Sequence, residues 1–362
     1  MPELFIITPE WSEQSWLSTG GTRAKKIIVS PEGKVYFFKQ SQYKPATETK
    51  LGKDFTYEFW NEIIAYELGV MLGFNMLRYD IAIDGDNMGC ISESMIDLDS
   101  EELNEGLKYL KAFSPKYDVN NKEHRSWYTF DLINNSLQAV KLEGYIKQIV
   151  QIIVFDSIIG NGDRHQENWA IITGQRLLSD MIEEFQNSKN YPLLSTFKKQ
   201  ILQITKQLFR KSENKFNLRL EPKPKSFYKP VESFAPIYDS GSSLGRELTE
   251  SRVNQYLKND KDLNYYIDKG QAEIHWEGKK VSHFKLIDYI NDGIHSSYLK
   301  TIIQQVENNF DAEKFQKILN NIDEKVPDQY RQYKIPQNRK ELIFKIITLR
   351  LKKLCAPTNE RI

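Results

Sequence analysis

The chain contains very few cysteines, no long apolar segment and no clear excess of charge of either sign. Cys90 and Cys355 are the only cysteines among 362 residues, which excludes a scaffold built on disulfides and fits a reducing compartment. No stretch approaches the roughly 18 uninterrupted apolar residues that a membrane helix needs. We therefore expect no membrane span.

The balance of charge and the N-terminus exclude further classes. Basic and acidic residues number 50 and 49, whereas an obligate nucleic-acid binder needs a strong basic excess for its phosphate contacts. The N-terminal "MPELFIITPEW" has no basic segment followed by an apolar run, so it does not resemble a secretory signal. We expect a cytoplasmic protein without a direct nucleic-acid partner. Signal-independent export to a host or neighbouring cell stays open.

The first hundred residues are rich in strand patterns. "KKIIVSPEGKVYFFKQS" predicts a hairpin that turns at Pro31–Gly33, and "MLRYDIAIDGDNMGCISESMI" predicts a second hairpin that turns at Asp84–Asn87. Between them, "YEFWNEIIAYELGVMLGF" has helical periodicity and ends at a glycine. The apolar positions of this helix are Phe59, Ile63, Tyr66, Val70 and Leu72. These elements predict a small β-rich lobe over residues 1–97.

The remainder, residues 98–362, is predicted to be mainly helical. "EGYIKQIVQIIVFDSII" indicates a largely buried helix, and "KELIFKIITLRLKKL" a closing amphipathic helix. Residues 175–230 are basic and end in a proline-punctuated stretch. We interpret them as an insertion between two short strands, "WAII" and "FAPIYD", whose basic face either meets an acidic partner or is simply solvated. The fold class is therefore α+β, with two lobes and a cleft between them.

Polar residues at the junction of the lobes suggest chemistry. Lys39 ends an apolar strand, where a buried ammonium requires an anion. Glu62 on the following helix can supply it, with Glu58 one turn earlier as the alternative. Each residue taken singly has an ordinary interpretation, as a strand-end lysine or a solvated helix face.

A second set of polar residues follows the buried helix. "GNGDRHQENWAII" contains Asp163, His165 and Asn168, and Asp239 lies in "APIYDSGSSLG". Carboxylate and amide oxygens are the ligands that Mg²⁺ prefers alongside phosphate and water. The order Lys, Glu, Asp-x-His-x-x-Asn, Asp supplies the components of phosphoryl transfer, in which one Asp accepts the hydroxyl proton. We expect His165 to brace this loop and Asp156 to hydrogen-bond its backbone.

These motifs resemble the HipA-like kinase family, most closely its short CtkA-type branch. The resemblance rests on "GNGDRHQEN", "APIYDSGSSLGREL", "NEIIAYELGVMLGF", "VYFFKQS" and the closing helices. It implies a serine/threonine protein kinase that uses ATP and Mg²⁺, with a protein hydroxyl as acceptor. Asp163 would be the catalytic base, Asn168 and Asp239 the Mg²⁺ ligands, and Lys39, held by Glu62, the partner of the ATP phosphates.

The resemblance also implies roles for two further segments. In "STGGTRAKK", residues 18–23 would form the loop that covers the phosphates, with Gly20, Gly21, Thr22 and Arg23 binding ATP, and Ser18, Thr19 and Thr22 would be autophosphorylation sites. The backbone at Glu93 and Met95 would bind adenine. HipA toxins carry an extra N-terminal segment that helps to bind an antitoxin, and this chain starts almost at the kinase lobe, so an antitoxin-like regulator is not the favoured partner.

Two alternatives remain at this stage. Phosphatidylinositol kinases also use Asp-Arg-His-x-x-Asn, which Arg164 completes here, so a lipid or small-molecule kinase is the first alternative. The second is a nucleotide-binding regulator without catalysis. That alternative predicts loss of the base or of a metal ligand, whereas Lys39, Asp163, Asn168 and Asp239 are all present.

Overall fold

The computed structural model describes residues 1–14, 25–41, 43–44, 53–177 and 228–356. The chain divides into two compact units. The larger comprises Met1–Ile96, Leu103–Ile171 and Phe234–Ile362, and the smaller comprises Asp97–Glu102 and Ile172–Ser233. The predicted phosphate-covering segment, residues 18–23, and most of the predicted insertion lie outside the described residues. The predicted lobe boundaries stay predictions.

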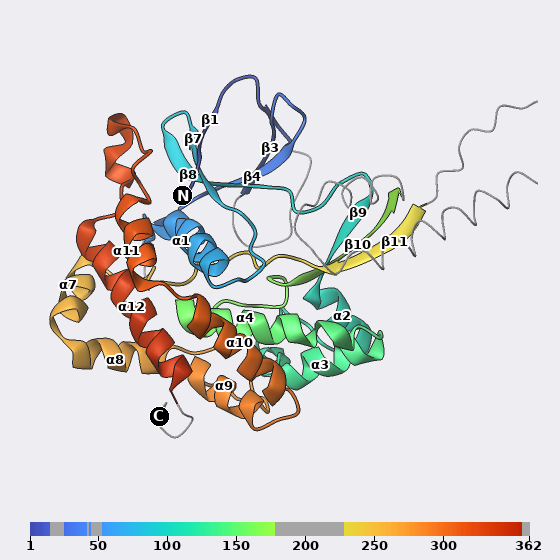
Figure 1. Cartoon of the computed structure of the whole chain (residues 1–362). Helices are drawn as coiled ribbons and strands as arrows, with labels where there is room; N and C mark the ends of the chain where they lie inside the picture. The colour runs from blue at the N-terminus through green and yellow to red at the C-terminus, as the bar shows by residue number, and fades with distance from the viewer. Residues whose placement is uncertain (15–24, 42, 45–52, 178–227, 357–362) are drawn as a thin grey trace, which may run out of the picture. The chain divides into compact units, whose positions relative to one another are not determined.

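The larger unit begins with a six-stranded sheet in the order β1-β7-β8-β4-β3-β2 (Figure 1). The strands are β1 (Leu4–Ile7), β2 (Ser12–Glu13), β3 (Lys25–Val29), β4 (Val35–Gln40), β7 (Asp80–Asp84) and β8 (Asn87–Glu93), and a separate ribbon pairs β5 (Tyr43–Lys44) with β6 (Lys53–Asp54). Both predicted hairpins are confirmed. Strand β1, which pairs in parallel with β7, was not predicted.

Helix α1 (Glu58–Met71) packs against β4 and β8 and confirms the predicted helix. Its first eight residues, Glu58 to Ala65, are all buried. Farther along the helix only one side is covered, and Val70, predicted to belong to the apolar stripe, is 51% exposed. The helix ends at Met71 with Leu72 as its C-cap residue, and the next residue, Gly73, adopts a positive φ of 83°.

The rest of the larger unit is mainly helical, as predicted. The helices are α2 (Gly106–Phe113), α3 (Phe130–Ala139), α4 (Ile146–Ile159), α7 (Glu250–Lys258), α8 (Asp260–Lys269), α9 (His283–Asn291), α10 (Ser296–Asn309), α11 (Ala312–Asn321) and α12 (Gln337–Cys355), with 3-10 turns at Lys122–Trp127, Glu143–Tyr145 and Asp328–Tyr333. Helix α4 contacts α9, α10 and α12 (Figure 1). The sequence predicts a largely buried helix here, and its apolar positions Ile146, Ile149, Val150, Ile153 and Phe155 are all buried. One core therefore runs from α1 through α4 to α12.

A three-stranded sheet has the order β11-β10-β9, with β9 (Glu101–Glu105), β10 (Ala170–Leu177) and β11 (Tyr228–Phe234). The predicted strand "FAPIYD" is only partly correct, because β11 ends at Phe234. The following segment makes a single parallel bridge between Ile237 and Met76. There Ile237 N donates to Asn75 O at 2.8 Å and Leu77 N donates to Ile237 O at 3.0 Å. A loop rather than a strand lies beside Ile237, so pairing stops after one residue.

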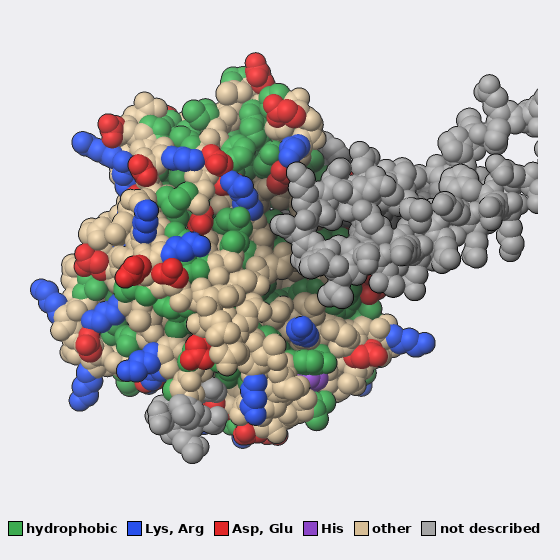
Figure 2. Space-filling view, in the orientation of Figure 1, with side chains coloured by type: hydrophobic (Ala, Val, Ile, Leu, Met, Phe, Trp, Pro, Cys, Tyr) green, Lys and Arg blue, Asp and Glu red, His purple; other side chains and the backbone are tan. Residues whose placement is uncertain are grey.

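The surface facing the viewer in Figure 2 mixes basic and acidic side chains. Among the described residues, no helix combines the length and apolar character needed to cross a membrane.

Candidate functional site

Lys39 lies at the centre of a buried ionic cluster. Strand periodicity turns Lys39 to the opposite face from Phe38, and its ammonium donates to Glu62 Oε1 at 2.9 Å and to Asp239 Oδ1 at 2.8 Å. Burial alone would lower the pKa of Lys39, but the charges of Asp239 and Glu62 outweigh it and the pKa is raised well above its ordinary value. Lys39 is therefore a fixed positive charge.

Glu62 also contacts the segment that follows Asp239. Its second carboxylate oxygen accepts a hydrogen bond from Ser240 N–H at 2.7 Å. A Cβ at Gly241 would lie 3.0 Å from Glu62 Oε1, so a glycine allows the backbone to pass this carboxylate closely. Glu58, the alternative considered from sequence, is paired with Arg246 instead. Glu62, and not Glu58, is therefore the glutamate of α1 that pairs with Lys39.

The loop after α4 brings the predicted base and amide together. Helix α4 ends at Ile159, and the φ of 69° at its C-cap residue Gly160 turns the chain sharply. Asp163 Oδ2 accepts a hydrogen bond from Ser242 Oγ at 3.0 Å. The Asn168 side-chain amide donates to Asp163 O at 2.8 Å, which fixes the orientation of the amide and directs Oδ1 away from that carbonyl.

Arg164, which completes the motif shared with phosphatidylinositol kinases, fixes this loop. Its guanidinium binds both carboxylate oxygens of Asp156, at 3.0 and 2.9 Å, and Asn168 O at 3.0 Å. It also donates to Tyr238 O and, at 3.4 Å, to Ser240 Oγ. Arg164 therefore connects the loop to both residues that flank Asp239.

The Arg164–Asp156 pair is almost completely buried, with side chains 1% and 6% exposed. Burial raises the pKa of Asp156 although Arg164 opposes this, whereas burial would lower the pKa of Arg164 and the charge of Asp156 raises it. The sequence signal for this pair was Asp156 itself, an acid near the end of an otherwise apolar helix, because a buried carboxylate needs a cation. The main-chain carbonyl of Asp156 also accepts hydrogen bonds from the N–H groups of Gly160 and Asn161. These main-chain bonds are the expected contacts between Asp156 and the backbone that leads into the loop.

The His165 side chain is 29% exposed. Its Nδ1 lies 3.7 Å from Glu167 Oε2 and accepts a hydrogen bond from Glu167 N at 3.4 Å, a contact within the loop. The bracing role of His165 stays a prediction. The side chain of Glu93, at the predicted adenine-binding segment, is 51% exposed and pairs with Lys34 at 3.0 Å. Met95 is partly buried. The cluster around Lys39 thus unites Glu62 and Asp239, and it does not include these three residues.

The residues available for a divalent cation are Asn168 and Asp239. Both are buried, at 4% and 8% exposure, and both present oxygen, which suits a hard cation. Asp239 adopts a φ of 55°, a strained conformation that recurs at functional positions. Within the described ranges, no group of three or more His, Cys, Asp or Glu side chains could hold a metal ion. The site fits Mg²⁺ only if phosphate and water complete its coordination.

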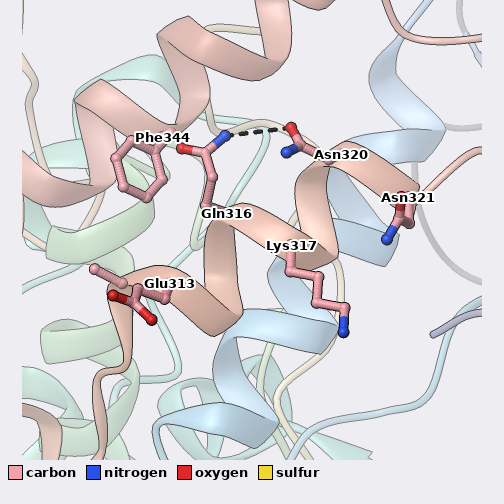
Figure 3. Close-up of a pocket in the computed structure, with 7 residues that line it drawn as sticks. Glu313, Gln316, Lys317, Asn320, Asn321 and Phe344 are labelled. Carbon is pink, nitrogen blue, oxygen red and sulfur yellow. Dashed lines mark hydrogen bonds between the residues drawn. The ribbon is translucent and has the colours of Figure 1, made fainter.

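A surface hollow of about 480 Å³ lies elsewhere, on α11 and α12 (Figure 3). It is lined by Ala312, Glu313, Gln316, Lys317, Asn320, Asn321 and Phe344. Gln316 and Asn320 hydrogen-bond to each other along its wall at 3.3 Å. None of these residues belongs to the ionic cluster.

No protein-family model matches the chain, and no curated protein matches it in sequence. The proinflammatory kinase CtkA of Helicobacter pylori is similar in structure, with a TM-score of 0.60 and 14% identity over 94% of this chain and 92% of that chain. This likeness confirms the predicted two-lobed kinase-like fold. HipA of Shewanella oneidensis MR-1, solved with HipB and operator DNA, gives a TM-score of 0.44 and 13% identity over 93% of this chain and 64% of that chain.

Proposed function

We propose that the chain is a serine/threonine protein kinase of the HipA-like, CtkA-like type that requires ATP and Mg²⁺. The observation that carries this proposal is the buried cluster in which Lys39 binds Glu62 and Asp239 at 2.9 and 2.8 Å. Three charges within one buried cluster are expensive to maintain for stability alone. Their arrangement suits a site that receives another, highly charged ligand.

Each residue then has a defined task. Lys39, oriented by Glu62, would neutralise phosphate oxygens of ATP, and Asn168 with Asp239 would hold Mg²⁺. When bound, the metal supplies charge neutralisation of the transferred phosphoryl group. Asp163 would accept the proton of the attacking hydroxyl, because a general base must lie within hydrogen-bond reach of that proton. Arg164 keeps Asp163 and Asp239 in a fixed relation through its contacts on both sides.

Several finer points belong to the same proposal. The acceptor would be a serine or threonine of a protein, in the cytoplasm or in a cell that the protein enters. Ser18, Thr19 and Thr22 would be autophosphorylated, and the basic segment over residues 175–230 would contact an acidic partner. The adenine would bind the backbone at Glu93 and Met95. Phosphatidylinositol is the alternative acceptor.

The test is the intact mass of the purified protein after incubation with Mg²⁺ and ATP, beside Asp163→Asn and Asp239→Asn. These substitutions keep the side-chain shape and remove the charge. We expect the wild type alone to gain phosphate or to phosphorylate serine peptides, with at least about a 100-fold loss in each variant. Circular dichroism verifies that the variants are folded.

Activity of the wild-type level in either variant would contradict the assignment. A parallel assay with phosphatidylinositol vesicles separates the two acceptors. Phosphate on the lipid, with none on the protein or on peptides, would favour the lipid kinase.

A further inference from the structure

The hydroxyl of Ser242 occupies the position that an acceptor hydroxyl takes beside a general base. Its Oγ donates to Asp163 Oδ2 at 3.0 Å. This distance lies within the range of about 2.6–3.2 Å from which a base abstracts a proton. Ser242 lies three residues after Asp239, so the segment that provides a metal ligand also provides this hydroxyl.

The backbone on both sides of Ser242 is held by specific bonds. Ser240 N donates to Glu62 at 2.7 Å. Asn61 Nδ2 donates to Ser243 O at 2.7 Å, and Leu244 N donates to Ile159 O at 2.9 Å. These bonds fix the approach of Ser242 to Asp163 and limit the entropy lost when the hydroxyl reacts.

The neighbouring hydroxyl is engaged differently. Ser243 Oγ donates to Ser240 O at 2.6 Å, and Ser243 is 2% exposed. Of these two adjacent serines, Ser242 bonds to Asp163, whereas Ser243 is more deeply buried and bonds to a backbone carbonyl. Ser243 is a natural control for Ser242.

We propose that Ser242 is an intramolecular acceptor, phosphorylated by the active site of its own chain. This inference rests on the proposed kinase function. The Ser242 Oγ–H proton passes to Asp163, an Oγ–P bond forms, and the bond between the γ-phosphorus and the bridging oxygen of ATP breaks. ADP leaves with the electron pair of that bond. Because Ser242 is only partly exposed and already bound to the base, transfer takes place within one molecule.

Phosphorylation at Ser242 silences the kinase. A phosphoserine carries about −1.5 to −2 charges near neutral pH. At Ser242 this charge would lie next to the Asp163 carboxylate and block the place of an incoming hydroxyl. The segment from Ser240 to Leu244 is fixed by its hydrogen bonds to Glu62 and Ile159. It therefore leaves the modified side chain little freedom to withdraw. The modification therefore acts as a brake that the enzyme applies to itself.

The experiment uses the full chain and maps phosphate by peptide mass spectrometry after incubation with Mg²⁺ and ATP. The variants are Ser242→Ala and its control Ser243→Ala. We expect phosphate on Ser242 in the wild type and in Ser243→Ala, at a rate independent of protein concentration. Ser242→Ala should lack that phosphate, and the purified phosphorylated fraction should transfer phosphate to a serine peptide at least about tenfold more slowly.

An isotope-labelled Asp163→Asn chain, mixed with unlabelled wild type, tests whether transfer is intramolecular. The labelled chain should remain unmodified at Ser242, and phosphate there would overturn the intramolecular route. Wild-type protein that phosphorylates peptides or other sites but never Ser242 would overturn this inference and leave the proposed function standing. A chain that transfers phosphate to nothing would overturn both.

Discussion

Lys39 and the two glutamates of α1 illustrate how position, rather than residue type, decides the role of a charge. Glu58 and Glu62 are one helical turn apart and both are buried. Glu62 binds Lys39 on one side and Ser240 on the other. Glu58 pairs with Arg246, whose guanidinium also lies 4.4 Å from the centre of the Phe55 ring. The two carboxylates are thus matched in element and burial and differ in partner.

The first prediction compares Glu62→Gln with Glu58→Gln. Loss of a charge-assisted hydrogen bond of about 1.5–3 kcal/mol should lower kcat/KM for ATP by roughly 10- to 100-fold in Glu62→Gln, because Lys39 loses its fixed orientation. Glu58→Gln should lower kcat/KM by less than about threefold while reducing stability by a similar energy. Steady-state kinetics and urea unfolding measure the two effects. Equal kinetic losses in both variants would refute the separate roles.

The C-terminal end of α4 is a junction between helices, and it leads directly into the loop that contains Asp163. Arg350 of α12 reaches it and donates to Ser157 O at 2.9 Å and, at 3.5 Å, to Ile267 O near the end of α8. In the described part of the chain Arg350 forms no ion pair, and burial lowers its pKa to about 10. Two helix C-termini, each with partial negative charge, take the place of a carboxylate partner.

Gly160 is the point at which this junction can be tested. A Cβ there would lie 2.9 Å from Arg350 Nη2, and φ is +69°; Gly33 has φ +83° with nothing within 4 Å. Gly33→Ala should therefore cost about 1–2 kcal/mol from backbone strain alone. Gly160→Ala should cost more, since Arg350 must also shift, and it should lower kcat. Urea unfolding measures the stability losses of the two variants, and peptide phosphorylation measures kcat. Equal stability losses with unchanged kcat would contradict the role assigned to this junction.

At the scale of the whole molecule, the sequence predicted what depends on local pattern. Both hairpins, α1, α4 and α12 followed from periodicity and turn residues, and the contact between Lys39 and Glu62 followed from their elements. Strand β1 was missed because its parallel partner, β7, lies more than seventy residues away. The bracing role of Arg164 was missed because it depends on three segments meeting around one guanidinium, which spacing does not encode.

The interior of the larger unit also sets a pH dependence of stability. His283 begins α9 and is 2% exposed. Burial, with smaller effects from Arg350 and Lys280, lowers its pKa well below the ordinary 6.5. The unfolded chain then binds a proton below pH 6.5 that the folded chain does not bind. Stability from the neutral imidazole is complete above pH 6.5 and is lost as the pH falls below it.

The last prediction is that His283→Gln flattens this dependence. Between pH 7.5 and 5.5 the free energy of unfolding of the wild type should fall by about 1 kcal/mol more than that of the variant, since one such proton contributes up to about 1.4 kcal/mol per pH unit. His295, whose pKa is lowered by burial while the residue is only partly buried, provides the control. His295→Gln should change the slope less. Urea unfolding at several pH values measures both slopes, and parallel curves for wild type and His283→Gln would show that His283 is not the titrating group.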